Sequence, residues 1–405
     1  MAITDKKKGV WELDQVYNKI NQGSIWDYDG ENLLYAWGRN SNGNLGLNEG
    51  PGPGSRSSPT QIPGNWLGHF SQGGGSNQGA TLFVGKETAG TLWAWGLGWG
   101  GMLGLGDQTS RSSPMQVGTD TTWAHACQQG FSLGTKTDGT LWSWGYNNKG
   151  QLGQNQGPGN DTNARSSPIQ IGSGTDWSTG DNKICCGSAA AFALKTDGTL
   201  WAWGNGPTGV LGLNQENTER SSPAQVGTDT TWSKLANGSG GSNAAIKTDG
   251  TLWTWGGNGY GSLGHNQNPS SPDSNYSSPN QVGTDTNWDS ISIDTSARAT
   301  KTDGTMWVWG RNLTGRLGLN QPSNSHYSSP VQLPGDWTAN LAGAHPSTYN
   351  AIKTDGTLWS WGYNNYGVVG VNDRTDYSSP KQVGSGTDWV LAHGGGNALY
   401  ATISK

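Results

Sequence analysis

One pattern recurs seven times along this chain of 405 residues. Each copy has an aromatic residue, a small residue and then Trp-Gly, with the tryptophans at 37, 95, 144, 203, 255, 309 and 361. Successive tryptophans are 58, 49, 59, 52, 54 and 52 residues apart. A period of about fifty residues is typical of one four-stranded propeller blade and is too long for a rung of a solenoid. The repeat therefore predicts a single all-β propeller of seven blades.

Each repeat carries signals for four antiparallel strands. The stretch Leu141-Trp142-Ser143-Trp144 alternates bulky and smaller side chains, as a strand with two different faces does. It follows a Thr-Asp-Gly segment at 137–139, which predicts a hairpin turn because Gly tolerates positive φ. The Ser-Ser-Pro segment and the segment after a further tryptophan supply the other two strands. We therefore expect four-stranded antiparallel blades.

Twenty of the 23 tryptophans occupy repeat positions, so we interpret them as packing residues between blades. The two chain ends complement each other. Residues 390–405 have the form of the two strands that precede the hairpin turn, and Tyr28-Asp29-Gly30 with Leu34–Trp37 match the turn and the strand after it. This predicts one propeller domain over residues 28–405, in which both termini build one blade and close the ring.

At these positions the chain resembles the regulator of chromosome condensation repeat family. The matching motif is Asp-Gly-x-Leu-Trp-x-Trp-Gly-x-Asn-x-x-Gly-x-Leu-Gly, as in Asp138 to Gly153. The resemblance covers residues 28–405 and implies a seven-bladed propeller. It implies no single function, because the family includes a nucleotide exchange factor, ubiquitin ligases and a secreted inhibitor of β-lactamases. The wealth of Trp, Gly, Asn and Ser is similar to the phage and bacterial members.

Composition restricts the partners. The 24 basic and 29 acidic side chains give a net charge of −5, and no basic run exceeds Lys6-Lys7-Lys8. Nucleic-acid binding lacks its usual electrostatic signature. No apolar stretch is long enough to cross a bilayer, and the N-terminus does not resemble a signal peptide. We expect a protein made in the host cytoplasm that neither binds nucleic acid nor inserts into a membrane.

The sequence predicts no enzyme, cofactor or metal site. The six histidines occupy unrelated repeat offsets and form no metal-binding pair. The recurring Asp of Thr-Asp-Gly is interpreted as a turn residue, the alternative being a pair of catalytic carboxylates. Cys127, Cys185 and Cys186 show no zinc spacing and are interpreted as buried small apolar residues.

Two sets of loops vary in length among the repeats. Between Leu-Gly and Ser-Ser-Pro lie 10, 7, 12, 8, 12, 9 and 7 residues, and the connection between the first two strands varies as well. In a meander both connections lie at the same end of the blade. We therefore expect one variable face, which is where recognition surfaces usually form.

Five aromatic residues on these loops are the predicted binding residues. Three break the repeat pattern, namely Trp99, Tyr260 and Tyr366, and Tyr146 and Tyr363 lie in the same turns. Such amphipathic aromatics suit a protein or glycan surface. The Arg or Tyr before each Ser-Ser-Pro is regular, which favours a framework role over a ligand-binding one.

Residues 1–27 precede the propeller and predict a docking extension. Leu13, Tyr17 and Ile20 fall on one face of a short predicted helix, beside Trp11. The segment from Lys8 through Trp26 resembles leaders of tailed-phage structural proteins. This resemblance implies that Trp11, Leu13, Tyr17 and Ile20 dock onto other virion proteins.

The resulting hypothesis is a non-enzymatic virion protein of a tailed phage. It would be a tail fibre, tail-associated or capsid decoration protein that binds a partner or a host surface protein or glycan through the variable loops. The alternative is a bacterial propeller that inhibits an enzyme or acts as a protein-interaction scaffold.

Overall fold

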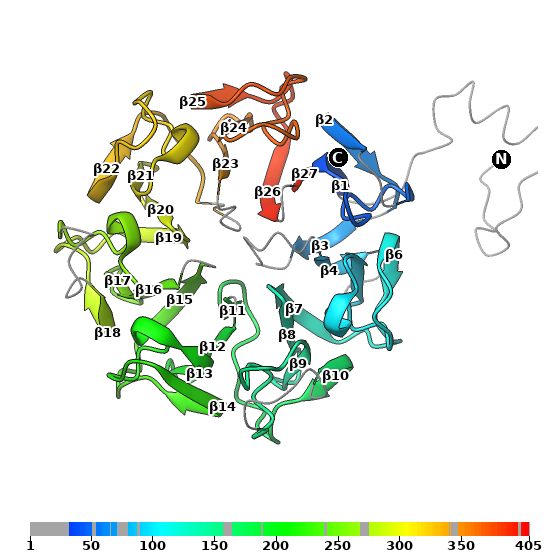
Figure 1. Cartoon of the computed structure of the whole chain (residues 1–405), viewed down its shortest axis with the longest axis vertical. Coiled ribbons are helices and arrows are strands. Elements are labelled where there is room, and N and C mark those ends of the chain that lie inside the picture. The colour runs from blue at the N-terminus through cyan, green and yellow to red at the C-terminus, as the bar shows by residue number, and fades with distance from the viewer. Residues whose placement is uncertain are drawn as a thin grey trace, which may run out of the picture.

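The computed structural model describes residues 32–404 except 51–53, 65, 71–79, 87–89, 157–163, 188, 239–240, 268–274, 340, 342–346 and 396–397. Its antiparallel sheets stand side by side in a ring, each running from the centre to the rim (Figure 1). The chain is an all-β propeller, as its repeats predict. The predicted helix of the leader lies outside the described residues.

Five four-stranded sheets are built from consecutive strands. The first two comprise β3 (Trp66–Phe70), β4 (Ala80–Lys86), β5 (Leu92–Gly96) and β6 (Arg111–Gln116), then β7 (Trp123–Gln128), β8 (Phe131–Lys136), β9 (Leu141–Gly145) and β10 (Arg165–Gln170). The third comprises β11 (Ile184–Cys186), β12 (Ala190–Leu194), β13 (Leu200–Gly206) and β14 (Thr218–Gln225). The next two comprise β15 (Trp232–Asn237), β16 (Ser242–Lys247), β17 (Leu252–Gly256) and β18 (Tyr276–Gln281), then β19 (Trp288–Ile293), β20 (Ser296–Lys301), β21 (Met306–Gly310) and β22 (Tyr327–Leu333). Short 3-10 turns follow some of the third strands, namely η1 (Trp99–Gly101), η3 (Pro207–Gly209), η4 (Gly259–Gly261) and η6 (Leu313–Gly315).

The sixth four-stranded sheet joins the chain ends and confirms the predicted closure. Its order is β2 (Ser55–Ile62), β1 (Asn32–Arg39), β27 (Ala398–Ser404) and β26 (Trp389–Gly395). Strands β1 and β27 pair in one unbroken antiparallel register, from Asn32 opposite Ser404 to Gly38 opposite Ala398. The last strands of the chain are thus held by the first, and no strand edge is left between them.

The prediction of seven four-stranded blades is wrong. One sheet has three strands, β23 (Thr348–Ile352), β24 (Leu358–Gly362) and β25 (Tyr377–Gln382), so the described residues form six four-stranded blades. Where the fourth strand was expected, the described residues show an isolated bridge between Trp337 and Lys353. The sequence between them contains Gly343 and Pro346, residue types that weaken strands.

The Trp-Gly tryptophans seal each sheet against the one before it. All seven are essentially inaccessible to solvent. Each donates its indole N–H, over 2.8–3.0 Å, to a backbone carbonyl of the preceding repeat. The donor and acceptor residues are Trp37 and Val368, Trp95 and Asn44, Trp144 and Met102, Trp203 and Gln151, Trp255 and Val210, Trp309 and Ser262, and Trp361 and Arg316.

The glycine of each Leu-Gly makes this contact possible. At Gly153 a Cβ atom would lie 2.9 Å from Nε1 of Trp203, and the backbone there has φ +67°. Any other residue would push the indole away and strain the turn. The repeat motif therefore encodes contacts between neighbouring sheets as well as the strands themselves.

Candidate protein-binding face

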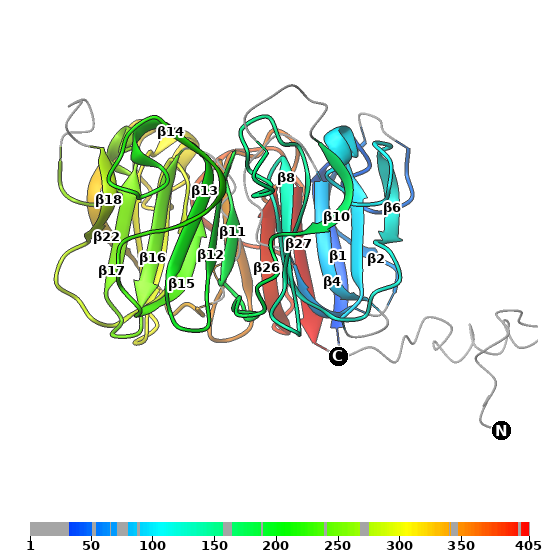
Figure 2. The same ribbon diagram turned by 90° about the horizontal axis from the view of Figure 1, so that it is seen from below.

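The two faces of the propeller disc carry different connections. Thr-Asp-Gly hairpins and the connections between sheets lie on one face, which also holds the C-terminal end of β27 (Figure 2). We call this the hairpin face. The connections from the first to the second strand and from the third to the fourth strand of each sheet lie on the opposite face. We call this the loop face; it carries all five predicted binding residues.

On the hairpin face the recurring carboxylates are already engaged within their own turns. In each intact Thr-Asp-Gly turn, Oδ1 of the Asp accepts the backbone N–H and the hydroxyl of the Thr two residues later. Those hydroxyl and backbone hydrogen bonds hold the pKa of each carboxyl below its usual value; the residues are Asp138, Asp197, Asp249, Asp303 and Asp355. A general acid needs the opposite shift. The geometry supports the interpretation of these residues as turn formers.

The lysine of each hairpin is also part of the framework. Nζ of Lys136 lies 3.8 Å from the centre of the Trp142 ring and 5.0 Å from that of Trp123. It also pairs with Asp120 at 2.7 Å. The same cation–π arrangement and ion pair recur at Lys195, Lys247 and Lys301. The charges of the hairpin face thus serve to hold each sheet together.

On the loop face, each long loop is fastened to the neighbouring sheet. A backbone N–H of the loop donates over 2.7–2.8 Å to the carbonyl of the first Ser of the next Ser-Ser-Pro. The donor and acceptor residues are Asn48 and Ser112, Gly106 and Ser166, Asn155 and Ser221, Asn214 and Ser277, Asn266 and Ser328, Asn320 and Ser378, and Asn372 and Ser57. The first part of each loop is therefore docked on the neighbouring sheet.

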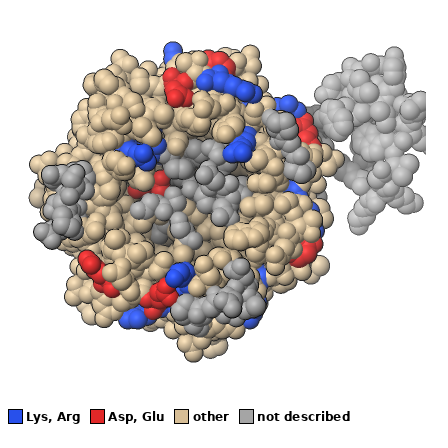
Figure 3. All heavy atoms as spheres, viewed as in Figure 1, with Lys and Arg blue, Asp and Glu red and all other residues tan. Residues whose placement is uncertain are grey.

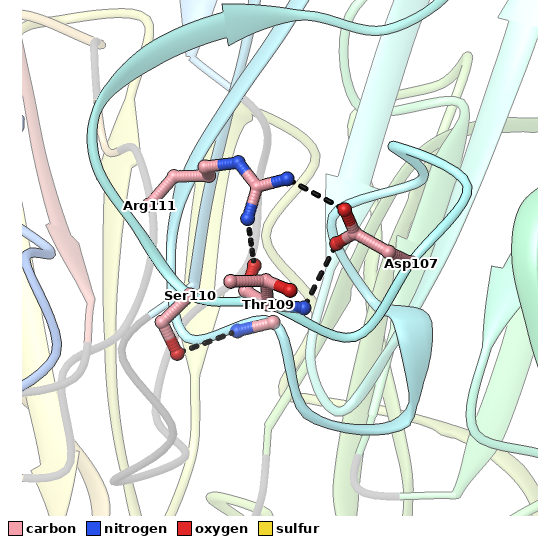
Figure 4. A network of polar contacts seen from close by, with 5 residues as sticks. Asp107, Thr109, Ser110 and Arg111 are labelled. Carbon is pink, nitrogen blue, oxygen red and sulfur yellow. Dashed lines mark hydrogen bonds and ion pairs between the residues drawn. The ribbon is translucent and has the colours of Figure 1, made fainter.

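The loop that carries Trp99 has a further network of its own (Figure 4). Arg111 donates to Asp107 over 2.6 Å and to the carbonyl of Thr109 over 2.9 Å. Asp107 also accepts the backbone N–H of Thr109, and this bond, followed by the one from Arg111, lowers the pKa of Asp107. Ser110 accepts the backbone N–H of Gly98, which directly precedes η1. These bonds fix both ends of the loop around Trp99.

Trp99 itself is an exposed aromatic on this fixed loop. Trp99 is 47% exposed, the highest value among the exposed large hydrophobic residues that the structure describes. Its ring packs on Tyr146 of the next sheet, with centroids 5.0 Å apart and planes inclined by 30°. The structure thus brings together two of the five predicted residues, which lie 47 positions apart in the sequence.

Tyr260 makes an equivalent contact three sheets further along the ring. The guanidinium of Arg311, on the next sheet, lies 4.6 Å from the centre of the Tyr260 ring. His326 packs edge-on against the same ring at 4.9 Å, and its Nδ1 accepts the backbone N–H of Asn312. Burial, and then the charges of Arg311 and Arg316, lower the pKa of His326. Tyr260 is 40% exposed, so this cluster presents an aromatic surface beside a cation.

The third contact joins Tyr366 to the first repeat across the closure. The guanidinium of Arg39 lies 4.8 Å from the centre of the Tyr366 ring. Tyr363 packs against Tyr366 with centroids 6.4 Å apart. Trp99, Tyr260 and Tyr366 do not form one site; they mark three separate clusters on the loop face.

Sequence reasoning missed Arg39, Arg311 and His326. The two arginines could have been found from the sequence. The residue directly after Trp-Gly in one repeat contacts the aromatic residue in the turn after Trp-Gly of the preceding repeat. That position holds Arg39, Tyr146 and Arg311 in the three pairs. Reading the repeats in neighbouring pairs would have found all three contacts.

In four repeats the residue before Ser-Ser-Pro has the predicted framework role. Arg56 and Arg111 form ion pairs with acidic residues of their own loops, Glu49 and Asp107. Arg220 donates to Gln215, and the hydroxyl of Tyr377 donates to Asp373. Each of these side chains closes its own loop.

Charge is sparse on the loop face. Figure 3 shows scattered acidic and basic atoms among a large majority that are neither. Among the described residues, no cluster of His, Cys, Asp or Glu has the size needed to hold a metal ion. None of the described helices has the length and apolar character needed to cross a bilayer. The face is best suited to contacts through aromatic and polar groups.

A family model for the regulator of chromosome condensation (RCC1) repeat matches residues 138–194, 249–296 and 355–401. Each matched segment begins at the Asp of a Thr-Asp-Gly turn and runs into the inner strands of the next sheet. These three segments match the RCC1 repeat. The resemblance seen in the sequence and the propeller fold are both confirmed.

Two curated plant proteins are similar to this chain over part of their length. The ultraviolet-B receptor UVR8 of Arabidopsis thaliana is 27% identical over 205 residues, which cover 50% of this chain and 46% of the relative. The mitochondrial RCC1 domain-containing protein RUG3 of the same plant is 27% identical over 308 residues, which cover 73% of this chain and 59% of the relative. The match thus spans about half the length of these relatives.

Two solved structures share the fold. Prp20p of Saccharomyces cerevisiae superposes with a TM-score of 0.77 at 20% identity, covering 93% of this chain and 92% of that one. Human WBSCR16 superposes with a TM-score of 0.76 at 20% identity, and the match covers 92% of this chain and 99% of that one. The Prp20p structure was described together with its binding properties to Gsp1p and histones. At this identity the likeness shows the fold alone.

Proposed function

We propose that this chain is a non-enzymatic binding protein whose loop face takes a protein partner. The observation that carries the proposal is the exposed Trp99, stacked on Tyr146 and held by a hydrogen-bonded loop. Trp and Tyr are enriched among the residues that dominate the binding energy of protein interfaces. A loop held in one conformation loses little conformational entropy when a partner binds.

Three further observations support the proposal. Tyr260 and Tyr366 each lie beside an arginine, and aromatic and Arg side chains are both enriched at protein interfaces. The carboxylates of the hairpin face are engaged in turns and have lowered pKa values. A related propeller, Prp20p, has been studied for binding to other proteins.

Replacing Trp99 with Ala is expected to weaken partner binding by about thirty-fold, the size of a 2 kcal/mol hot spot. Wild-type and W99A proteins are used as matched baits in candidate host or lysate fractions, and the dissociation constant of each recovered partner is then measured. The matched control is Met115→Ala, because Met115 is 44% exposed but lies on the outer strand β6. Equal affinity of wild type and W99A, with W99A folded, would contradict the proposal.

Display on a tailed-phage particle stays a prediction. The docking residues Trp11, Leu13, Tyr17 and Ile20 lie outside the described residues, and the relatives named above come from a plant, yeast and human. The phage or bacterial branch of the family likewise stays a prediction. The alternative, an enzyme inhibitor or scaffold, would use the same loop face.

If the leader docks the propeller on a particle, Leu13→Asp with Ile20→Asp is expected to abolish incorporation. An apolar contact that holds two such side chains cannot accept two carboxylates without a large desolvation cost. Copies of the protein are counted on purified particles, and melting curves verify the propeller fold. Normal incorporation of the folded double variant would mean that the leader is not the docking segment.

A further inference from the structure

Two cysteines from neighbouring sheets meet inside the propeller. Cys127 lies in β7 and Cys186 is the last residue of β11, and their Sγ atoms are 2.8 Å apart. Both side chains are buried. A disulfide bond is about 2.05 Å long, so the two sulfur atoms would have to approach each other by less than about 1 Å.

Packing alone does not require sulfur at this place. The pair lies in one core cluster with Phe131, Leu133 and Ala191. Repeat alignment through the strand registers puts Ala236 and Ile293 at the equivalent positions between β15 and β19. Those two residues also share a core cluster. An ordinary apolar contact therefore serves the same structural purpose elsewhere in the ring.

The third cysteine faces the other way. Successive side chains of a strand point to opposite faces, so Cys185 leaves β11 on the side away from Cys186. Cys185 accordingly packs with Leu235 and Trp255, in the core cluster of the following interface. The chain thus contains one facing pair and one separate thiol, which serves as an internal control.

We infer that Cys127 and Cys186 form a reversible disulfide that links two neighbouring sheets when the protein meets a low-molecular-weight disulfide. One thiolate attacks the oxidant, such as oxidised glutathione, to give a mixed disulfide and one glutathione thiol. The second cysteine displaces the other glutathione and completes the bond between the sheets. The two cysteines lose two protons and two electrons, and two glutathione thiols are formed.

The burial of the pair sets the conditions for this reaction. Burial raises the pKa of both thiols above the ordinary cysteine value. The thiolate is the reactive form, so oxidation is slow at neutral pH and becomes faster as the pH rises. Because neither sulfur is exposed, the oxidant reaches the pair when the interface opens or while the chain folds.

The bond would change the stability of the ring. It would join residues 59 positions apart and would hold the sheet of β7–β10 to the sheet of β11–β14. Linking distant residues restricts the unfolded chain. We expect the melting temperature of the oxidised protein to rise by about 4 °C for a chain of this size.

The test uses the full-length protein and its Cys127→Ser, Cys186→Ser and Cys185→Ser variants, each exposed to oxidised glutathione. Free thiols are then counted by alkylation under denaturing conditions, and peptide mapping identifies any link. The oxidised wild-type protein should be alkylated only at Cys185, whereas the reduced protein should be alkylated at all three cysteines. The oxidised protein should also melt at the higher temperature. The oxidised Cys185→Ser variant should show the same melting shift as wild type and should have no free thiol left to alkylate. The Cys127→Ser and Cys186→Ser variants should show no melting shift.

The inference is overturned if oxidised wild type keeps three alkylated thiols after prolonged exposure at raised pH and during refolding. It is equally overturned if the mapped link joins Cys185 to either of the other cysteines. Circular dichroism of the serine variants verifies their fold, and this test is independent of any binding partner.

Discussion

Replacing Trp203 with Ala is expected to lower the free energy of unfolding by about 4 kcal/mol. The Trp203 side chain has no exposed surface, and its ring lies 6.4 Å from that of Trp177 with the planes inclined by 59°. Cys186 and Ile184 belong to the same core cluster. Its indole N–H also donates to the carbonyl of Gln151 in the preceding repeat, over 2.9 Å. Truncation opens a cavity between two sheets and leaves that carbonyl without its donor.

Denaturant unfolding followed by tryptophan fluorescence measures this loss. Trp99→Ala is the matched control, because the Trp99 side chain is 47% exposed and its main contact is Tyr146. We expect a loss of about 1 kcal/mol there, the contribution of one aromatic pair. Comparable losses at the two positions would show that Trp99 belongs to the core and would remove the basis of the proposed binding site.

Deleting residues 390–405 is expected to prevent formation of a soluble monomer. The deletion removes β27 and all but the first residue of β26, and thereby half of the sheet that closes the ring. It exposes the paired edge of β1 from Asn32 to Gly38 and removes Tyr400, whose ring packs against Trp95 in the next sheet. An exposed strand edge beside uncovered apolar surface promotes association between chains.

Size-exclusion chromatography with light scattering distinguishes the outcomes. Deletion of residues 1–26, which precede β1, is the control and should leave a folded monomer with an unchanged melting curve. A soluble, monomeric protein lacking residues 390–405 that melts like the full chain would disprove closure by the two termini.

The blade architecture could be predicted because its signals are local. The Thr-Asp-Gly hairpins need only a turn that tolerates positive φ next to alternating strands, and the chain ends contain complementary halves of one repeat. The three-stranded sheet could not be predicted, since the repeat landmarks Trp337 and Lys353 are both present. Whether a strand forms between these two landmarks depends on local packing, which the landmark residues do not specify.

The candidate site was predicted in part. Breaks in the repeat identified Trp99, Tyr260 and Tyr366, and the structure shows that each contacts the residue after Trp-Gly of the next repeat. The partners Arg311 and Arg39 were missed because the contact joins residues about fifty positions apart or, at the closure, at opposite ends of the chain. That pairing depends on how neighbouring sheets are placed, which a single repeat does not specify.

The sequence by itself determined the strand pattern, the burial of the Trp-Gly tryptophans and the closure of the ring, because each depends on short-range chemistry repeated along the chain. Only the tertiary structure decided which side chains meet across the sheets. The stacking of Trp99 on Tyr146, the cation beside Tyr260 and the meeting of Cys127 with Cys186 arise between neighbouring blades. Such contacts depend on the handedness and spacing of the whole ring, which form only when the repeats pack together.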